Sequence, residues 1–250
     1  MKYLKFTTVL VTIAFFSCSQ NEAINSTSPD KNIKVDVNLS EKGELTYKIT
    51  HKNNEVIKTS KLGFDFEGIP SLKEDFEILK ATNSSFNETW QMPWGEQLDV
   101  INNYNQLKVE LQEKSELKRK LNIVFRVYND GSGFRYEFPD QENLSEVLIT
   151  EEHTEFNLTG DHKVWWIPGD WDIYEHLYNT TKLSEIDALQ FANHENLAQT
   201  YIPYNAVNTP VTMKTAIGLH LSFHEAGLVD YAGMTLEVDT VNYSLKSVLV

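Results

Sequence analysis

Cysteine is almost absent from this chain of 250 residues, which contains only Cys18. A single cysteine cannot form an internal disulfide bond, so the fold must be stabilised without one. The chain also lacks a glycine-rich phosphate-binding loop, the His-Glu-x-x-His pattern of zinc peptidases and the Gly-x-Ser-x-Gly pattern of serine hydrolases. The sequence therefore shows none of the motifs by which nucleotide-binding proteins, zinc peptidases and enzymes with a serine or cysteine nucleophile are most easily recognised.

Positive charge is scarce as well. There are 22 Lys and Arg residues against 36 Asp and Glu residues, which gives a formal net charge of −14. Such a balance argues against nucleic acid or an anionic membrane surface as the main partner. It suits neutral ligands and divalent cations.

Long hydrophobic runs are missing except near the start of the chain. An apolar stretch over residues 6–16 follows Lys2 and Lys5, and it is too short to span a bilayer as a mature helix. It ends in Phe-Phe-Ser-Cys, so residues 1–18 resemble the export signal of a bacterial lipoprotein, with Cys18 as the lipidated residue. An ordinary cleaved signal with an incidental cysteine is the alternative. We expect residues 19–31, which are polar and rich in Ser and Asn, to tether an exported, membrane-anchored domain on the periplasmic face of a membrane or at the cell surface.

Helical periodicity is weak throughout the chain, and the dominant period from residue 33 onward is two. Alternating segments at 33–39 and 44–50 flank a turn, and a second pair surrounds Asn129–Gly133. Further strands are predicted at 106–111, 146–149, 154–158, 163–167, 211–216, 219–224 and 234–238. Residues 184–199 fit either a helix or an irregular loop. The pattern predicts an all-β fold, a large antiparallel β-super-sandwich over residues 32–250. The final strand-like segment stops at Val250, so we expect the chain to be part of a longer protein.

Aromatic and acidic side chains alternate in the segment VWWIPGDWDIYEHLY, residues 164–178. Trp165 and Trp166 must point to opposite faces of a strand, so only one faces the core by default. Trp171 and Glu175 follow on a loop after Pro168 and Gly169. Glu175 can be a plain surface carboxylate, or it can share a sugar-binding cleft with the indoles.

Two other segments have both a structural and a functional interpretation. In 89–107, Trp90 and Trp94 can be core aromatics beside a turn or can line a cleft edge. In 218–233, His224 lies on the polar face of a strand, whereas Glu225 falls at an apolar position and needs a partner. That partner can be Arg126 or Arg135, or Glu225 can reach a site at the edge of the sandwich.

Taken together, these segments resemble the N-terminal domain of glycoside hydrolase family 97, the α-glucosidase and α-galactosidase family typical of Bacteroidetes. The matching stretches span roughly residues 31–248 and are WGEQLDVINNYNQLKVEL, LNIVFRVYNDGSGFRYEFP, TEFNLTGDHKVWWIP, YEHLYNTTKLSEI, TPVTMKT and GLHLSFHEAGLVDYAGMTLEV. The resemblance implies a galactose-mutarotase-like sandwich followed by a catalytic (β/α)₈ barrel and a small C-terminal β-sandwich. It places the catalytic carboxylates on the barrel, so no residue of this chain is assigned a catalytic role.

The resemblance also implies a calcium ion shared with the barrel, to which the N-terminal domain contributes one glutamate. By position in YEHLY that residue is Glu175, with Glu225 as second choice, which fits the many hard oxygen ligands that calcium takes. Oligosaccharide contacts are expected at Trp171, Glu175 and His224. The leading hypothesis is a non-catalytic, carbohydrate-binding N-terminal domain of a calcium-dependent α-glycosidase.

Three alternatives stay open at this point. The chain can be a stand-alone lipid-anchored glycan-binding protein. It can be a sugar-isomerising enzyme that uses His224 with Glu225 or His176 with Glu175 as acid and base, an idea that depends on fold analogy alone. It can also be the product of a truncated gene.

Overall fold

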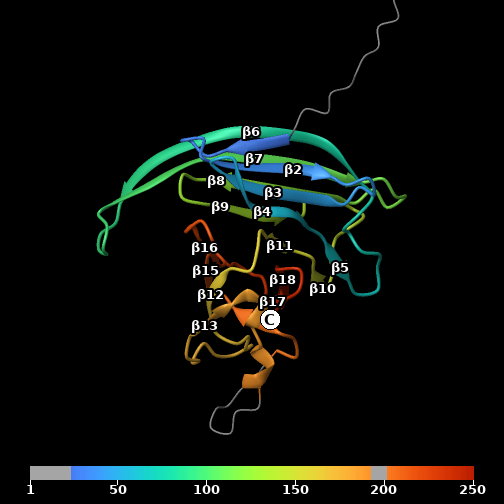
Figure 1. The fold of residues 1–250 in the computed structure, drawn as a ribbon. Coiled ribbons are helices and arrows are strands. Elements are labelled where there is room, and N and C mark those ends of the chain that lie inside the picture. The colour runs from blue at the N-terminus through green and yellow to red at the C-terminus, as the bar shows by residue number, and fades with distance from the viewer. Residues whose placement is uncertain (1–23, 193–201) are drawn as a thin grey trace, which may run out of the picture.

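The computed structural model describes residues 24–192 and 202–250, and these form an almost entirely β structure (Figure 1). The strands are β1 (Ile24–Thr27), β2 (Ile33–Leu39), β3 (Leu45–His51), β4 (Asn54–Lys61), β5 (Phe64–Phe66), β6 (Phe76–Gln91), β7 (Asp99–Glu113), β8 (Lys120–Val127), β9 (Ser132–Glu137), β10 (Ile149–Glu152), β11 (Glu155–Leu158), β12 (Lys163–Trp166), β13 (Asn179–Lys182), β14 (Ala206–Asn208), β15 (Val211–Lys214), β16 (His220–Phe223), β17 (Met234–Asp239) and β18 (Ser244–Leu249). Two 3-10 turns, η1 (Leu183–Glu185) and η2 (Ala188–Phe191), occupy part of the segment that fits either a helix or a loop. Residues 193–199 of that segment lie outside the described residues.

The strands form one large sheet and three smaller ones, and every pairing is antiparallel. The eight-stranded sheet has the order β1-β2-β3-β4-β11-β18-β17-β14. Two four-stranded sheets have the orders β6-β7-β8-β9 and β13-β12-β15-β16, and β10 pairs with β5. The predicted all-β, antiparallel super-sandwich is therefore confirmed.

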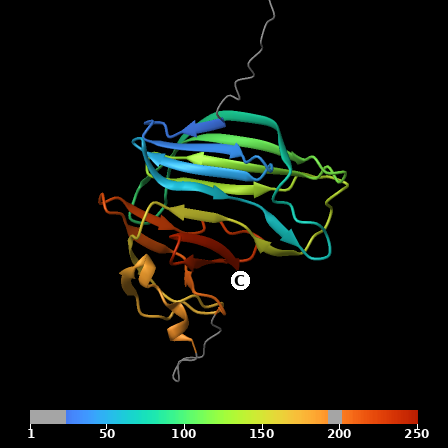
Figure 2. The ribbon, with the colours of Figure 1, turned by 45° about the vertical axis from the view of Figure 1, so that its right-hand side comes forward.

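Both four-stranded sheets cover the same face of the eight-stranded sheet (Figures 1 and 2). Phe156 on β11 shows this directly. Its ring lies 6.4 Å from that of Phe134 on β9 and 4.9 Å from that of Phe223 on β16, measured between centroids. A side chain points to one face of its strand, so β9 and β16 lie over the same side of β11. The two halves thus share one continuous core.

Apolar side chains at every second position build much of this core. In β8, Leu121, Ile123, Phe125 and Val127 are each 0% exposed. Tyr47 on β3 packs against Phe125 with ring centroids 5.6 Å apart, which joins the large sheet to the sheet of β6–β9. Aromatic pairs of this kind add dispersion attraction to the free energy gained by burying apolar surface.

A buried ion pair closes the end of the β7–β8 hairpin. Arg119 is 1% exposed, and its Nε and Nη2 donate to the two carboxylate oxygens of Glu113 at 2.8 and 2.7 Å. Its Nη1 and Nη2 also donate to the carbonyls of Pro70 and Ser71, both at 2.7 Å. Burial opposes the charge of Glu113, yet the hydrogen bonds from Arg119 outweigh it and lower the pKa of that carboxyl.

The N-terminal boundary corrects the sequence prediction. Residues 24–27 lie within the predicted tether, but they form β1 and pair with residues 34–37 of β2. Ser28 is fully buried, and its Oγ accepts a hydrogen bond from the backbone N–H of Ile33 at 2.9 Å. The polar composition of this segment predicts a tether, but an edge strand needs few apolar side chains, so composition does not distinguish the two. The predicted signal peptide, Cys18 and residues 19–23 of the predicted tether lie outside the described residues.

The long hairpin of β6 and β7 is the second difference. It projects beyond the end of β8 as a curved two-stranded arm (Figure 1). Trp90 is 46% exposed and Trp94 is 81% exposed, so the interpretation of these residues as core aromatics is wrong. Among the described residues, no helix has both the length and the apolar character needed to cross a membrane.

Candidate functional site

The topology of the sheet β13-β12-β15-β16 brings two predicted segments to one end. β12 and β16 both pair antiparallel with β15, so they run parallel to each other. Their C-terminal ends therefore lie at the same end of the sheet. The loop that follows β12, residues 167–178, and the loop that follows β16, residues 224–233, both leave from there. Trp171, Glu175, His224 and Glu225 all lie on these two loops.

The first loop has a rigid base. Gly169 N donates to Ala206 O at 2.8 Å, and a Cβ on Gly169 would lie 3.1 Å from that same oxygen. Asp170 is 4% exposed, and its Oδ1 accepts the backbone N–H groups of Asp172 and Ile173 at 2.9 and 3.2 Å. Asp170 thus folds the start of the loop in the way an N-cap residue does.

His176 ties the loop back to the same carboxylate. Its Nε2 lies 3.5 Å from Asp170 Oδ2, and both side chains are almost fully buried. The Asn208 side chain supports the loop from β14, since its Oδ1 accepts Asp170 N at 3.1 Å and its Nδ2 donates to Ile173 O at 3.2 Å. His176 is therefore a structural anchor.

The rim of the loop is exposed and aromatic. Trp171 is 47% exposed, Tyr174 62%, Leu177 91% and Tyr178 60%. Glu175 lies between these side chains and is exposed. Within the described part of the chain, its carboxylate takes part in no hydrogen bond or ion pair. Trp171 and Glu175 are thus both accessible on this loop.

Glu225 on the second loop has a different partner from those considered. Its Oε2 accepts the backbone N–H of Met234 at 3.0 Å. The proposed ion pair with Arg126 or Arg135 is wrong. The Arg126 guanidinium lies 4.6 Å from the ring centroid of Tyr104, and Arg135 pairs with Glu137 on its own strand. His224 is exposed, and its Nδ1 lies 3.0 Å from the carbonyl oxygen of Glu225.

A buried carboxylate on β10 was not foreseen as part of this region. Glu152 is 8% exposed, and it accepts hydrogen bonds from the hydroxyls of Tyr231 (2.7 Å) and Thr154. Burial raises the pKa of Glu152, and the charge of Glu225 raises it further. Burial and Glu152 also raise the pKa of Tyr231. The pair Glu151–Glu152 was visible in the sequence, but its place beside the loop 224–233 depends on long-range pairing.

A family model described as glycosyl-hydrolase 97 N-terminal matches residues 27–249. The chain belongs to this family. A retaining alpha-galactosidase of Bacteroides thetaiotaomicron is 22% identical over 248 residues, covering 94% of this chain and 33% of that protein. A family 97 enzyme from Pseudoalteromonas sp. strain K8, solved in complex with acarbose and with panose, is 35% identical with a TM-score of 0.78. That match covers 90% of this chain and 31% of the enzyme.

The likeness extends to a beta-arabinopyranosidase structure, 18% identical with a TM-score of 0.76, which supports the fold alone. That match covers 90% of this chain and 35% of the other. The family 97 domain described here therefore spans about a third of the length of these relatives.

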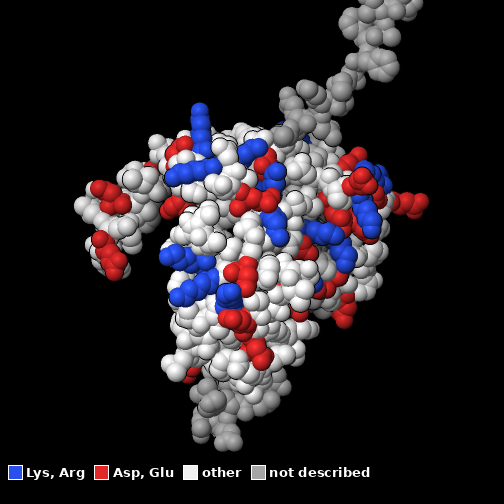
Figure 3. Space-filling view, in the orientation of Figure 1, with Lys and Arg blue, Asp and Glu red and all other residues white. Residues whose placement is uncertain are grey.

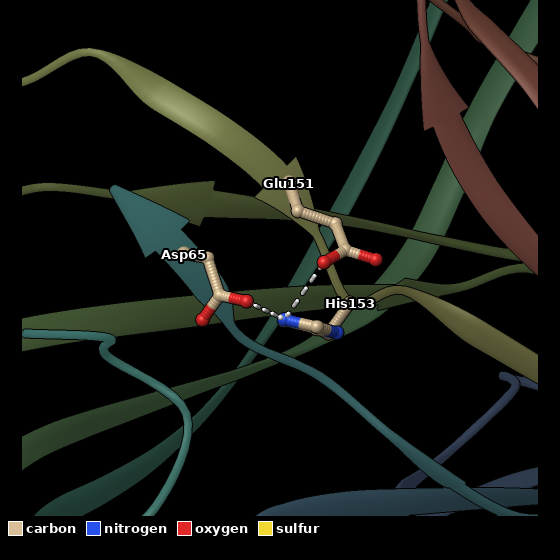
Figure 4. Close-up of side chains that lie close together, drawn as sticks. All are labelled: Asp65, Glu151 and His153. Carbon is tan, nitrogen blue, oxygen red and sulfur yellow. Dashed lines mark hydrogen bonds and ion pairs between the residues drawn. The ribbon is translucent and has the colours of Figure 1, made fainter. Parts of the chain in front are cut away.

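The family 97 domain also contains a mixed cluster of acidic and basic side chains on β5, on β10 and directly after β10 (Figure 4). His153 Nε2 lies 2.8 Å from Asp65 Oδ2 and 3.8 Å from Glu151 Oε2. The spacing would allow a metal ion, yet Lys73 Nζ lies 2.9 Å from Asp65 and 3.3 Å from His153, and Lys246 pairs with Glu151. Burial opposes ionisation of Asp65, but hydrogen bonds from Lys73 and His153 hold its pKa at about 2. Two ammonium groups already balance the carboxylates, so this cluster is best described as an ion-pair network.

Proposed function

We propose that this chain is the non-catalytic N-terminal domain of a calcium-dependent α-glycosidase, and that the loop 171–178 forms one wall of the oligosaccharide site. The remaining wall and the catalytic carboxylates would come from a barrel domain of the same protein. Two facts support this: the chain spans about a third of its relatives, and one of them was solved with panose and acarbose.

The main support for the proposal is the exposed rim of the loop. An indole face packs well on the C–H face of a pyranose, and Trp171 presents its ring on a base fixed by Asp170. His224, which is exposed on the loop 224–233, would hydrogen-bond a sugar hydroxyl. Oligosaccharide is therefore the proposed ligand of Trp171, Glu175 and His224.

Glu175 fits a shared calcium ion better than Glu225 does. Its carboxylate is exposed and takes part in no hydrogen bond or ion pair within the described residues, whereas one oxygen of Glu225 already accepts Met234 N. Calcium takes about 6–8 oxygen ligands, so one glutamate of this domain would complete a site built mainly by the partner domain. The chemistry that calcium would supply is electrostatic stabilisation at the sugar.

A chimera tests the proposal. Residues 24–250 would replace the N-terminal domain of the Pseudoalteromonas enzyme, and hydrolysis of panose would be followed against calcium concentration. We expect Glu175→Gln to raise the calcium concentration for half-maximal activity by about tenfold, the usual scale for a weakened metal site. Asp172→Asn, which removes a charge from the same loop, should not. An unchanged calcium titration for Glu175→Gln would contradict the assignment.

The stand-alone alternative predicts a different result with the chain by itself. A glycan-binding protein would bind panose or acarbose directly in isothermal titration, and Trp171→Ala would abolish that binding. The proposed function predicts affinity too weak to titrate, because half of the site belongs to the partner domain. Tight binding that Trp171→Ala removes would favour the alternative.

We further propose that the protein is exported and lipid-anchored through Cys18. The charged and apolar segments before Cys18 support this. Metabolic labelling with palmitate in a bacterial host should mark the chain, and Cys18→Ser should remove the label. A labelled Cys18→Ser protein would contradict the assignment.

A further inference from the structure

The outer face of the sheet β13-β12-β15-β16 carries a row of basic side chains. Lys163 lies directly opposite Lys182 on one side and Lys214 on the other, and Lys214 lies opposite His220. All four residues are exposed. Figure 3 shows basic groups gathered on the surface over this sheet. Like charges placed directly across strands repel each other, so the row weakens the sheet that carries it.

Acidic side chains do little to relieve this repulsion. Among the described residues, no carboxylate lies within 4.0 Å of Lys163 or Lys214. Lys182 Nζ is 3.9 Å from Asp161, a carboxylate that is already hydrogen-bonded to Ser184. A protein with a net charge of −14 therefore maintains a local basic surface in which only Lys182, among the three lysines, has an ion pair with a described residue.

The neighbouring row of residues on the same face contains an aromatic side chain and two hydroxyl groups. Trp166 is 1% exposed and faces the core, so its neighbour Trp165 points outward and is half-buried. The His220 ring lies 6.1 Å from the Trp165 ring at an interplanar angle of 17°, and Lys163 Nζ lies 5.2 Å from its centroid. Thr212 and Ser222 flank this group, with their hydroxyl oxygens 2.9 Å apart.

We propose that this face binds an acidic glycan, a saccharide chain that carries carboxylate or sulfate groups. The lysine row supplies charge-assisted hydrogen bonds to the acidic groups, and Trp165 supplies an apolar surface for a sugar ring. The flat face of a sheet suits an extended chain better than it suits a small compact ligand.

This face of the sheet is distinct from the loops 167–178 and 224–233, which carry the proposed calcium and sugar contacts. Lys163 begins β12 and His220 begins β16, whereas the loops 167–178 and 224–233 follow the ends of those strands. The lysine row therefore lies at the opposite end of the sheet from Trp171. Because the whole molecule repels polyanions, affinity for an acidic glycan must arise at this local surface.

Isothermal titration of the purified chain with oligogalacturonate, and with malto-oligosaccharide as the neutral counterpart, tests the proposal. We expect binding of the acidic oligomer alone, weakening as salt is added. Replacing the three lysines by glutamine should weaken binding by about tenfold or more, since three charge-assisted contacts are lost. A control variant with the same change in charge elsewhere should bind as the parent does: Lys42→Gln, Lys80→Gln and Lys120→Gln.

Trp165→Ala separates a glycan site from a merely cationic patch. We expect it to weaken binding about fivefold or more while Trp171→Ala leaves binding unchanged, with circular dichroism confirming that both variants are folded. Absence of binding to oligogalacturonate would overturn the proposal. So would equal binding by the lysine variant, or binding that vesicles of anionic phospholipid reproduce and Trp165→Ala does not reduce.

Discussion

Arg119 and Glu113 show how much a single residue can contribute when charge is buried. Arg119→Gln leaves the Glu113 carboxylate in the core without its partner and two carbonyls without their donor. We expect a loss of about 3–5 kcal/mol in the free energy of unfolding, measured by urea denaturation at neutral pH. Arg135→Gln, which removes an exposed partner of Glu137, should cost less than about 1 kcal/mol.

The same pair allows a check on the mechanism of that loss. In the double variant Arg119→Met with Glu113→Leu, both buried charges are absent, so we expect much of the lost stability to return. A double variant as unstable as Arg119→Gln would show that the carbonyl contacts, and not the unpaired charge, dominate. Arg119→Gln as stable as Arg135→Gln would contradict the prediction altogether.

Asp65 gives the fold a pH dependence of definite sign. Its pKa is held at about 2 in the folded state by Lys73 and His153, below the ordinary value near 3.8 of an unfolded chain. Its contribution is therefore fully present above about pH 4 and is lost as pH falls toward 2. We expect the parent to lose about 1 kcal/mol more than Asp65→Asn over that interval in urea denaturation, a value reduced by solvent screening.

Glu41→Gln removes an exposed carboxylate and controls for the change in net charge. This variant should follow the parent across the same pH interval. If Asp65→Asn loses stability as steeply as the parent does, other carboxylates must be responsible for the acid sensitivity.

Among the elements, β1 carries a clear test of the domain boundary. A chain that starts at residue 32 lacks the ladder with β2 and the buried Ser28. We expect it to be about 2 kcal/mol less stable than a chain that starts at residue 24, since several backbone hydrogen bonds are removed. Thermal unfolding of the two chains measures the difference. Equal melting temperatures would restore the tether interpretation for residues 24–31.

For the β6–β7 arm we expect the opposite result, a small effect of its removal on stability. Replacing residues 89–101 by Asn-Gly closes the hairpin at the Glu88–Asn102 pair and removes Trp90, Trp94 and Ile101. These side chains are 46%, 81% and 70% exposed, so we expect a change of less than about 1 kcal/mol in urea denaturation. A loss above about 2 kcal/mol would mean that the arm packs against the domain.

These elements also show what sequence alone could reveal. Strands with a fully buried apolar face, such as β8, follow from alternation because burial in the core selects apolar side chains at every second position. β6 does not, since residues 79–91 are exposed along the strand and nothing selects their pattern. Trp171 and Glu175 were foreseen as neighbours because they are close in the chain. The convergence of the loops 167–178 and 224–233, and the burial of Glu152, depend on strand pairings that no local pattern encodes.

Across the whole molecule, the chain crosses repeatedly between the eight-stranded sheet and the sheet β13-β12-β15-β16. It leaves the large sheet after β11, returns at β14, leaves again for β15 and β16, and returns for β17 and β18. Neither half can therefore be formed from one continuous segment. The shared contacts of Phe156 join the two cores as well.

This interleaving predicts a single cooperative unfolding transition in spite of the two lobes in Figure 1. With Trp90, Trp94 and Trp171 replaced by Phe, the fluorescence of Trp165 and Trp166 reports on the smaller sheet, whereas far-ultraviolet circular dichroism reports mainly on the larger one. We expect the two signals to give the same urea midpoint. We also expect Phe223→Ala to move both midpoints together, because it removes a partly buried ring that packs between the sheets, with a loss of about 1–3 kcal/mol. Separate midpoints, or a shift confined to the tryptophan signal, would mean that the smaller sheet unfolds independently and that its loops are held by local contacts alone.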